Sequence, residues 1–338
     1  MQHTYKAIEL PAINTNIIKS MLGLRLVEKP LPEIGEQQLL VKMEAASCNP
    51  SDIAFLQGTY NVKKTMPCVP GFEGAGVIVA CGSTLKSKEW IGKRVSCFTQ
   101  RDKDGTWAEY FLADKNEVIV VGDQLDAQQA ATFFINPFTA WGLFDIALER
   151  ESKAIIINAA GSQVAAFMVA LAAKHGIKTI GIVRKAETAA MLANHGFDAL
   201  LVSTGEDFAA QLKAIAWELE ATTAYDAVGG EATGQLVNCL PPDSEVVVYG
   251  GLSAKAAAEI SIMQLIFNNV IITGFNLNDW IELADTEEFV EVKEALIDLI
   301  RSKTVYTRVQ LEVPVTDVVK GLRTYITSMS AGKMLIRF

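Results

Sequence analysis

The segment AIIINAAGSQVAAFMVALAAKHGIKTIGIVRK, residues 154–185, decides the fold. It joins two short apolar runs, 154–158 and 179–183, through a stretch whose apolar residues recur at the three- and four-residue steps of a helix. An apolar strand, a crossover helix and a second apolar strand form the unit that links parallel neighbours in a sheet. The segment therefore predicts a parallel sheet that is covered by helices on both faces.

The same alternation of apolar strands and amphipathic helices continues to about residue 275. Further apolar runs lie at 199–202, 224–228, 245–250 and 269–275, and residues 208–219 again have helical periodicity. Six strands can be counted in all. Residues 126–275 are therefore expected to form a doubly wound α/β domain.

The remainder of the chain predicts a second domain, built from short strands. Residues 38–45 alternate with a period of two, and glycine and proline interrupt the first 125 residues often, as in a compact barrel. Residues 276–338 read as a helix, a polar strand, a second helix and a terminal strand. We expect this tail to rejoin the domain formed by residues 1–125.

Composition narrows the possible partners. The 338 residues carry 30 Lys and Arg against 39 Asp and Glu, a net charge of −9, which argues against nucleic acid or an anionic membrane surface as a partner. The longest apolar stretch, 164–173, is too short to span a bilayer. No signal-peptide pattern is recognisable, and the five scattered cysteines suit reduced thiols. A small-molecule partner and a cytoplasmic location are expected.

The turn between the first two strands of the α/β domain is a candidate phosphate site. Such a turn places backbone N–H groups and the positive end of a helix dipole against a pyrophosphate. The match is weak, because Gly161 is the only glycine and Gln163 adds a side chain where the backbone should approach the phosphates. A crossover that binds no ligand remains an alternative.

Two cations at the end of the second strand favour one cofactor. Arg184 and Lys185 occupy the position at which an acidic residue usually hydrogen-bonds the ribose 2′-hydroxyl of NAD(H). Two cations suit a 2′-phosphate instead, so NADP(H) is preferred over NAD(H). A solvated basic strand end is the alternative. Gly250 and Gly251, after the fifth strand, are placed to admit a flat ring.

Five motifs together resemble the medium-chain dehydrogenase/reductase superfamily over nearly the whole chain. They are CNPSDIAFLQGTY at 48–60, VPGFEGAGVIVACG at 69–82, GTWAEYF at 105–111, AATFFINPFTAW at 130–141 and YDAVGG at 225–230. The resemblance implies a GroES-like catalytic domain, interrupted by a Rossmann domain and completed by the C-terminal tail.

The zinc ligands of the family's alcohol dehydrogenases are absent from the corresponding positions. A ligating Cys is replaced by Asn49, and the His of a G-H-E tripeptide is replaced by Phe72. Neither an amide nor a phenyl ring suits tetrahedral zinc. Cys48 reads as a small buried thiol, and His3, His175 and His195 are isolated in the sequence. No metal is expected.

Within the zinc-free branch the chain is most similar to quinone oxidoreductases and mitochondrial-type 2-enoyl thioester reductases. By this resemblance Tyr60 is the candidate proton donor, and Asn49, Asp52 and Trp280 belong to the substrate and nicotinamide pocket. The residues implied to contact NADPH are Asn136, Thr139, Gly161, Ser162, Gln163, Val164, Ala165, Arg184, Lys185, Tyr249, Gly250, Gly251, Leu252, Phe275, Asn276, Leu277 and Lys333.

The sequence thus predicts a zinc-independent, NADPH-dependent reductase of an activated C=C bond or of a quinone. Hydride would go to the β-carbon, and Tyr60 would donate or relay a proton to the α-carbon. Two alternatives remain open: a one-electron quinone reductase, which needs no proton donor, and a non-catalytic nucleotide-binding or scaffold protein. A homodimer is expected, formed partly through the strand at 269–275, whose apolar edge would otherwise be open.

Overall fold

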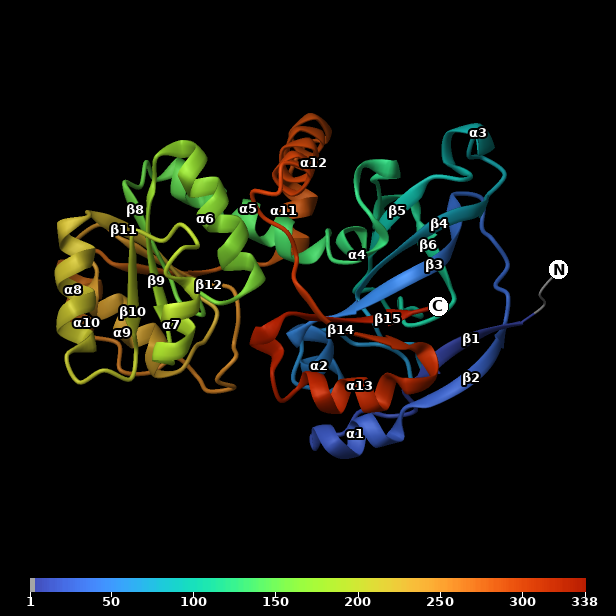
Figure 1. The fold of residues 1–338 in the computed structure, drawn as a ribbon, viewed down its shortest axis with the longest axis horizontal. Coiled ribbons are helices and arrows are strands. Elements are labelled where there is room, and N and C mark those ends of the chain that lie inside the picture. The colour runs from blue at the N-terminus through green and yellow to red at the C-terminus, as the bar shows by residue number, and fades with distance from the viewer. Residues whose placement is uncertain (1–3) are drawn as a thin grey trace. The chain divides into compact units, whose positions relative to one another are not determined.

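The computed structural model describes residues 4–338, which form two compact units (Figure 1). The first, here called the β-rich unit, contains the chain up to Ile135 together with Ile300–Phe338. The second, the parallel-sheet unit, is Asn136–Leu299. The chain therefore leaves the β-rich unit once and returns to it at its C-terminal end.

The parallel-sheet unit is built on six strands that all run in the same direction. Their order across the sheet is β10-β9-β8-β11-β12-β13. Numbered along the chain this is 3-2-1-4-5-6, the order of a dinucleotide-binding Rossmann sheet. The strands are β8 (Ala154–Ile157), β9 (Lys178–Val183), β10 (Ala199–Val202), β11 (Ala221–Asp226), β12 (Glu245–Val248) and β13 (Ile271–Gly274).

Helices flank this sheet because its strands are apolar on both faces. One core cluster joins Ile156, Ile180 and Val246 of the strands to Phe208 and Leu212 of a helix. The helices are α5 (Ile135–Glu149), α6 (Gln163–His175), α7 (Ala186–Leu192), α8 (Phe208–Glu218), α9 (Glu231–Cys239), α10 (Ile262–Phe267), α11 (Leu277–Leu283) and α12 (Thr286–Arg301). The six strands and the doubly wound α/β class predicted from the sequence are confirmed.

The β-rich unit contains a seven-stranded sheet and a separate two-stranded antiparallel sheet. The smaller sheet pairs β1 (Thr4–Glu9) with β2 (Arg25–Pro30). The larger sheet has the order β14-β15-β3-β4-β5-β7, with β6 also paired to β3. Its strands are β3 (Gln38–Cys48), β4 (Glu73–Cys81), β5 (Arg94–Phe98), β6 (Tyr110–Asp114), β7 (Val118–Val120), β14 (Val309–Pro314) and β15 (Lys333–Arg337). The helices are α1 (Ile17–Gly23), α2 (Pro50–Gln57), α3 (Ser87–Trp90), α4 (Ala127–Ala130) and α13 (Val318–Tyr325).

The C-terminal strand completes the sheet of the β-rich unit. β15 pairs antiparallel with β3, so that Met334 lies opposite Cys48. The buried face of β3 carries Leu39, Val41 and Met43, the alternating set expected from the sequence. This pairing brings residues from opposite ends of the chain into one core.

The breaks between the units differ from the boundaries at 125 and 275 expected from the sequence. They fall at 135 and 299, because the helices after β13 stay with the parallel-sheet unit. Phe289 of α12 stacks on Phe138 of α5 with ring centroids 5.1 Å apart. The return to the β-rich unit therefore begins near residue 300.

None of the helices among residues 4–338 is both long enough and apolar enough to cross a membrane.

Candidate active site

The turn between β8 and α6 carries the candidate phosphate site. Ser162 caps α6, and its side chain accepts a hydrogen bond from the backbone N–H of Ala165 at 3.2 Å. Gln163 and Val164 open the helix, whose first turn contains no acidic residue. The left-handed position of the turn is taken by Ala159, with φ of 48°, and not by Gly161. Because no carboxylate in this first turn would repel an anion, the N-terminus of α6 suits a phosphate group.

A buried polar network lies where the strand order reverses between β8 and β11. Asn158 donates from Nδ2 to Asp226 Oδ1 at 2.6 Å, and its Oδ1 accepts from the N–H of Ala227 at 2.7 Å. Asp226 Oδ1 also accepts from the N–H groups of Val228 and Gly229. This switch point is where ligands bind in open α/β sheets. The network fixes the two turns that border it.

The segment after β12 approaches the same edge of the sheet closely. A Cβ at Gly250 would lie 2.8 Å from the carbonyl oxygen of Ala227, whereas a Cβ at Gly251 would meet nothing within 4 Å. Glycine at 250 is therefore required by backbone contact. The buried Tyr249 hydroxyl lies beside Ser162, and burial raises the pKa of Tyr249. Leu252 is exposed.

Arg184 and Lys185 follow β9 at this edge and are both exposed. Neither side chain forms an ion pair with any residue that the structure describes. Within residues 4–338, no ion pair therefore neutralises their charges. Two such cations fit a phosphate monoester better than a neutral hydroxyl.

The first turns of α5 present two further residues expected at the cofactor. Asn136 and Thr139 are both buried and are three residues apart, which places them on one face of the helix. Within residues 4–338 the Asn136 Nδ2 group has no hydrogen-bond partner. A buried amide without a partner costs free energy unless a ligand satisfies it. Asn136 thus fits a hydrogen-bonding ligand.

The aromatic residues expected near the nicotinamide pack on α5. A Cβ at Gly142 would lie 2.6 Å from the Phe275 ring and 3.0 Å from the Trp280 ring. Gly142 therefore allows both rings to sit against the helix. Asn276 caps α11 by accepting from the N–H of Asn278, and Leu277 begins that helix.

In the β-rich unit, Asn49 is the centre of a buried hydrogen-bond network. Its Nδ2 donates to Ser47 Oγ at 3.0 Å and to Glu73 Oε2 at 3.1 Å, and its Oδ1 accepts from the Lys333 ammonium group. Ser47 also donates to Glu73 Oε2 at 2.8 Å. All four side chains are buried. The polar atoms of Asn49 are thus satisfied by the protein itself.

Two buried carboxylates share this region with the buried ammonium group. Asp52 accepts from the N–H groups of Asn49 at 2.7 Å and Phe72 at 3.0 Å, and burial raises its pKa to about 7. Burial also raises the pKa of Glu73 and lowers that of Lys333, while the nearby opposite charges act against both shifts. Lys333 is the cation that compensates these carboxylates.

The positions that hold zinc in the family's alcohol dehydrogenases lie side by side but offer no metal-binding set. Asn49 and Phe72 are linked through Asp52, and the Phe72 ring lies against Phe55 and Tyr60. Among residues 4–338 no three His, Cys, Asp or Glu side chains cluster as metal ligands. An amide already hydrogen-bonded to an ammonium group is a poor zinc ligand.

Tyr60 lies just after α2 on the rim of a pocket of about 530 Å³. Its ring is tilted against Phe72, with centroids 5.6 Å apart, and its hydroxyl oxygen accepts from Gln100 Nε2 at 3.1 Å. The pocket is lined by Ile13, Gly58, Thr59, Tyr60, Asn61, Val62, Lys63 and Lys64. Burial raises the pKa of Tyr60, so the phenol is protonated at neutral pH and can donate a proton.

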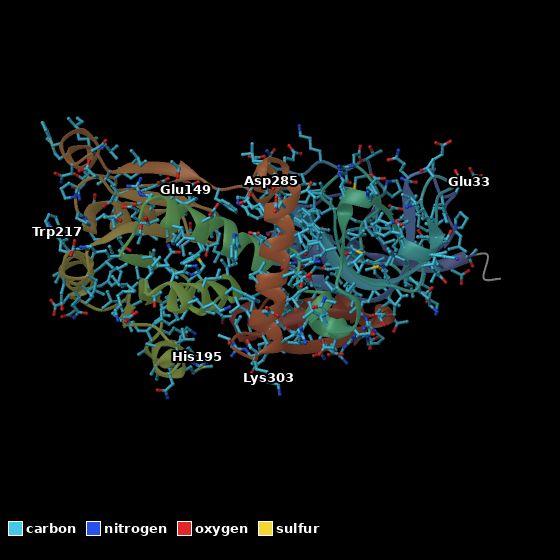
Figure 2. The ribbon with its side chains drawn as sticks, turned by 90° about the horizontal axis from the view of Figure 1, so that it is seen from above. Glu33, Glu149, His195, Trp217, Asp285 and Lys303 are labelled. Carbon is cyan, nitrogen blue, oxygen red and sulfur yellow. The ribbon has the colours of Figure 1, made fainter. Side chains whose placement is uncertain are left out.

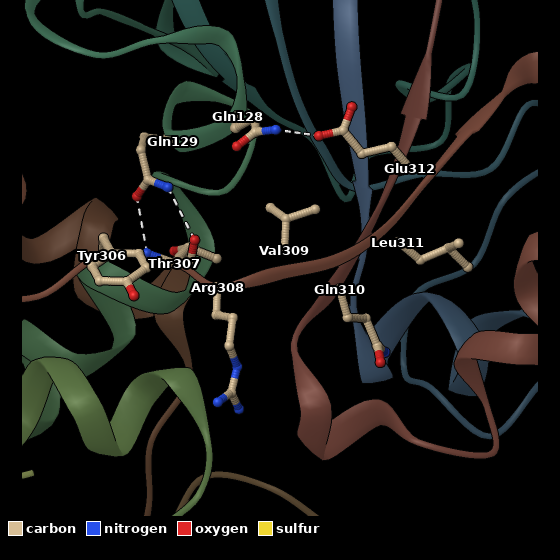
Figure 3. Close-up of a pocket in the computed structure, with 9 residues that line it drawn as sticks. All are labelled: Gln128, Gln129, Tyr306, Thr307, Arg308, Val309, Gln310, Leu311 and Glu312. Carbon is tan, nitrogen blue, oxygen red and sulfur yellow. Dashed lines mark hydrogen bonds between the residues drawn. The ribbon is translucent and has the colours of Figure 1, made fainter.

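A second pocket, of about 310 Å³, lies along β14 and α4 (Figure 3). There Gln129 exchanges two hydrogen bonds with the backbone of Thr307, at 2.9 and 3.0 Å. None of the expected site residues lines this pocket. We assign it no part in the candidate site.

The two described histidines, His175 and His195, form none of the site hydrogen bonds given above. His195, labelled in Figure 2, is exposed after α7. His175 ends α6, where its Nδ1 lies 2.9 Å from the Leu171 carbonyl oxygen. His3 lies outside the described residues.

Comparisons with known proteins agree with this architecture. Residues 35–123 match the alcohol dehydrogenase GroES-like domain, and residues 164–295 match the zinc-binding dehydrogenase domain. The mitochondrial enoyl-[acyl-carrier-protein] reductase of Bos taurus is 31% identical over 319 residues, covering 90% of this chain and 82% of that protein. Its counterpart from Xenopus tropicalis is 30% identical, covering 93% and 91%.

One solved structure is similar to this chain over nearly the full length of both proteins. It is described as a putative NADPH:quinone reductase from Mesorhizobium loti, and it is 29% identical with a TM-score of 0.91, covering 100% of this chain and 99% of that one. A Rossmann unit combined with a GroES-like unit defines a dehydrogenase fold. The chain belongs to the medium-chain dehydrogenase/reductase superfamily, a family of oxidoreductases.

Several groups in the site were not assigned from the sequence, among them Ser47 and Glu73 beside Asn49 and the three that follow. Asp226 and Asn158 are non-adjacent residues whose contact depends on the order of the strands. Gln100 meets Tyr60 across 40 residues of sequence. The sequence could have indicated Asp226, because it lies in the YDAVGG motif at the end of a buried strand. No sequence pattern marks Gln100, which follows a strand.

Proposed function

We propose that the protein is an NADPH-dependent, zinc-independent reductase of the activated C=C bond of a 2-enoyl thioester. The observation that carries the proposal is the Tyr60 phenol, which lines a pocket and whose oxygen accepts a hydrogen bond, so that its proton is left to donate. The relatives named enoyl-[acyl-carrier-protein] reductase support the thioester as acceptor. The acceptor would bind in the pocket lined by Ile13 and residues 58–64.

The cofactor would be held by the residues at the carboxyl edge of the parallel sheet. The capped N-terminus of α6 suits the pyrophosphate, Arg184 and Lys185 suit a 2′-phosphate, and the unpartnered amide of Asn136 suits a polar group of the ligand. When bound, NADPH supplies the hydride for the β-carbon of the acceptor. The direct contact of Lys333 with the cofactor stays a prediction.

The chain's own part in the reaction is proton transfer. Tyr60 would donate the proton that the α-carbon needs, as a general acid held by Gln100. Asn49 and Asp52, expected from the sequence in the substrate pocket, would act by holding α2 and the segment that follows it, because both are buried and hydrogen-bonded.

Turnover with a defined acceptor tests this function. The purified protein should oxidise NADPH when given a 2-enoyl thioester, and a strong chelator should leave the rate unchanged, because Asn49 and Phe72 offer zinc no ligand. Loss of activity with loss of stoichiometric zinc would contradict the metal-free mechanism. Absence of turnover with every thioester, enal or enone would contradict the proposed acceptor class.

Quinone reduction is the second candidate function. The 29% identity and the TM-score of 0.91 to a putative NADPH:quinone reductase favour it. One-electron transfer to a quinone requires no carbon protonation, so Tyr60 would be dispensable for it. NADPH binding without oxidation by any acceptor would instead favour a non-catalytic nucleotide-binding role.

Specificity for NADPH is expected to depend on Arg184. Replacing Arg184 with alanine removes one unneutralised cation, and a charge-assisted contact to phosphate is worth about 1.5–3 kcal/mol. NADPH binding should therefore weaken about tenfold or more, while NADH binding changes little. Equilibrium titration with both cofactors measures this. Equal weakening for both would assign Arg184 a structural role.

A homodimer is proposed through the β13 edge. β13 ends the sheet, and no strand of the described chain pairs with its far side. Exposed apolar side chains gather on β13 and on the preceding helix: Ile262, Met263, Ile266, Phe267, Ile271 and Ile272. Open strand edges and apolar patches favour association. Light scattering should give twice the chain mass, and Phe267→Asp should shift it toward one chain. A concentration-independent single-chain mass for the unaltered protein would refute the dimer.

A further inference from the structure

We propose that Gln100 is a positioning residue for Tyr60, whose carboxamide directs the phenol proton toward an acceptor in the adjoining pocket. The inference rests on the proposed function, because it assigns a role to a neighbour of the proposed proton donor. It also makes a statement about the Tyr60 hydroxyl that can be tested without turnover. Gln100 itself lines neither of the pockets described above.

The contact is a hydrogen bond of ordinary length between two segments of the same unit. Gln100 follows β5, Tyr60 follows α2, and the distance from Nε2 to the phenol oxygen is 3.1 Å. The Phe72 ring lies against one side of Tyr60. The phenol is thus held by a tilted ring contact and by a hydrogen bond at its oxygen.

The direction of that hydrogen bond decides where the phenol proton goes. A tyrosine hydroxyl has one proton and also accepts hydrogen bonds at its oxygen. Since the Gln100 N–H donates to the oxygen, the phenol proton is not used in this contact. It remains available to another acceptor, and Tyr60 is one of the residues that line the pocket.

The same hydrogen bond stabilises the product of proton donation. An N–H donor favours the phenolate over the phenol, so Gln100 lowers the pKa of Tyr60 while burial, the larger effect, raises it. Among the charged groups, Asp52 raises the pKa further. The Lys64 ammonium lies 5.8 Å from the centroid of the Phe72 ring on which Tyr60 packs, and Lys63 lines the same pocket. Gln100 therefore makes Tyr60 a stronger acid than its burial alone would allow.

Two substitutions separate hydrogen bonding from packing. Gln100→Leu removes the donor, and Gln100→Glu keeps nearly the same size but cannot donate when it is ionised. Both should slow reduction of a 2-enoyl thioester about tenfold, on the scale of one hydrogen bond to a charged group. Both should also move the alkaline limb of the rate profile to higher pH. NADPH affinity and quinone reduction should remain unchanged.

Gln310→Leu is the matched control. Gln310 lies in the same unit, and its Nε2 donates to the Ser328 carbonyl oxygen at 3.1 Å. This variant loses the same kind of hydrogen bond away from Tyr60, so its rate and pH profile should match those of the unaltered protein. Thermal unfolding of all three variants checks that each is folded.

The outcomes distinguish this inference from the proposed function. Full rate and an unshifted alkaline limb in both Gln100 variants, with Tyr60→Phe inactive, would overturn the role of Gln100 alone. In a Tyr60→Phe background, Gln100→Leu should have no further effect, and an additive loss would also overturn it. If the protein reduces no enoyl thioester, both the proposed function and the role of Gln100 in that reaction are contradicted. Spectroscopic titration of the Tyr60 phenol, assigned with Tyr60→Phe, would then test the hydrogen bond itself, with a higher pKa expected in Gln100→Leu.

Discussion

Replacing Tyr60 with phenylalanine is expected to slow the reduction of a 2-enoyl thioester about 100-fold or more, the usual scale of general acid catalysis. The change removes only the hydroxyl group, so the ring contact with Phe72 remains. NADPH affinity should stay near that of the unaltered protein. The measurement is the rate of NADPH oxidation at saturating cofactor, with the thioester as acceptor.

The acceptor provides the internal control for this variant. Reduction of a quinone that needs no carbon protonation should be much less affected by Tyr60→Phe. An equal and small loss with every acceptor would move Tyr60 to a packing role. An equal and large loss would indicate that the hydroxyl group orients the pocket and does not donate a proton.

Replacing Lys333 with methionine is expected to destabilise the protein by about 3–5 kcal/mol, the scale of leaving buried charges without the opposite charge that compensates them. Lys333 is 7% exposed, and the Glu73 and Asp52 carboxylates that it compensates are fully buried. Its loss also leaves Asn49 Oδ1 without its donor. Denaturant unfolding measures the effect.

A double variant and a surface control complete this test. In Lys333→Met/Glu73→Gln the ammonium group and the Glu73 carboxylate are both gone and only Asp52 remains, so part of the lost stability should return. Lys153→Met breaks the exposed pair with Glu220 and should cost no more than about 1 kcal/mol. If NADPH affinity falls equally in the single and double Lys333 variants, Lys333 contacts the cofactor directly, as the sequence predicted. Unchanged stability in Lys333→Met would contradict the compensating role.

Much of the fold could be predicted because it depends on local pattern. Each of the six strands of the parallel-sheet unit overlaps one of the apolar runs, and helices lie between them. The boundary after β13 was harder to place. The sequence of α12 does not say which unit its apolar face contacts, and the stacking of Phe289 on Phe138 settles that only in three dimensions.

The candidate site could be predicted where function depends on one short segment. Arg184 and Lys185 are recognisable because their place after the second strand has a known meaning. The network around Asn49 was not recognisable, since Lys333 lies 284 residues away in sequence and meets Asn49 only when β15 pairs with β3. The expected cytoplasmic location rests on sequence alone and stays a prediction.

Isotope labelling of the product tests most directly whether the protein adds hydride and a proton across an enoyl C=C bond. With NADPH deuterated at the transferred position, the saturated thioester should carry one deuterium at the β-carbon. With unlabelled NADPH in D₂O, it should carry one at the α-carbon, since a phenol exchanges its proton with solvent. A saturated product with no label at these positions, or NADPH oxidation without any saturated product, would contradict the proposed reaction.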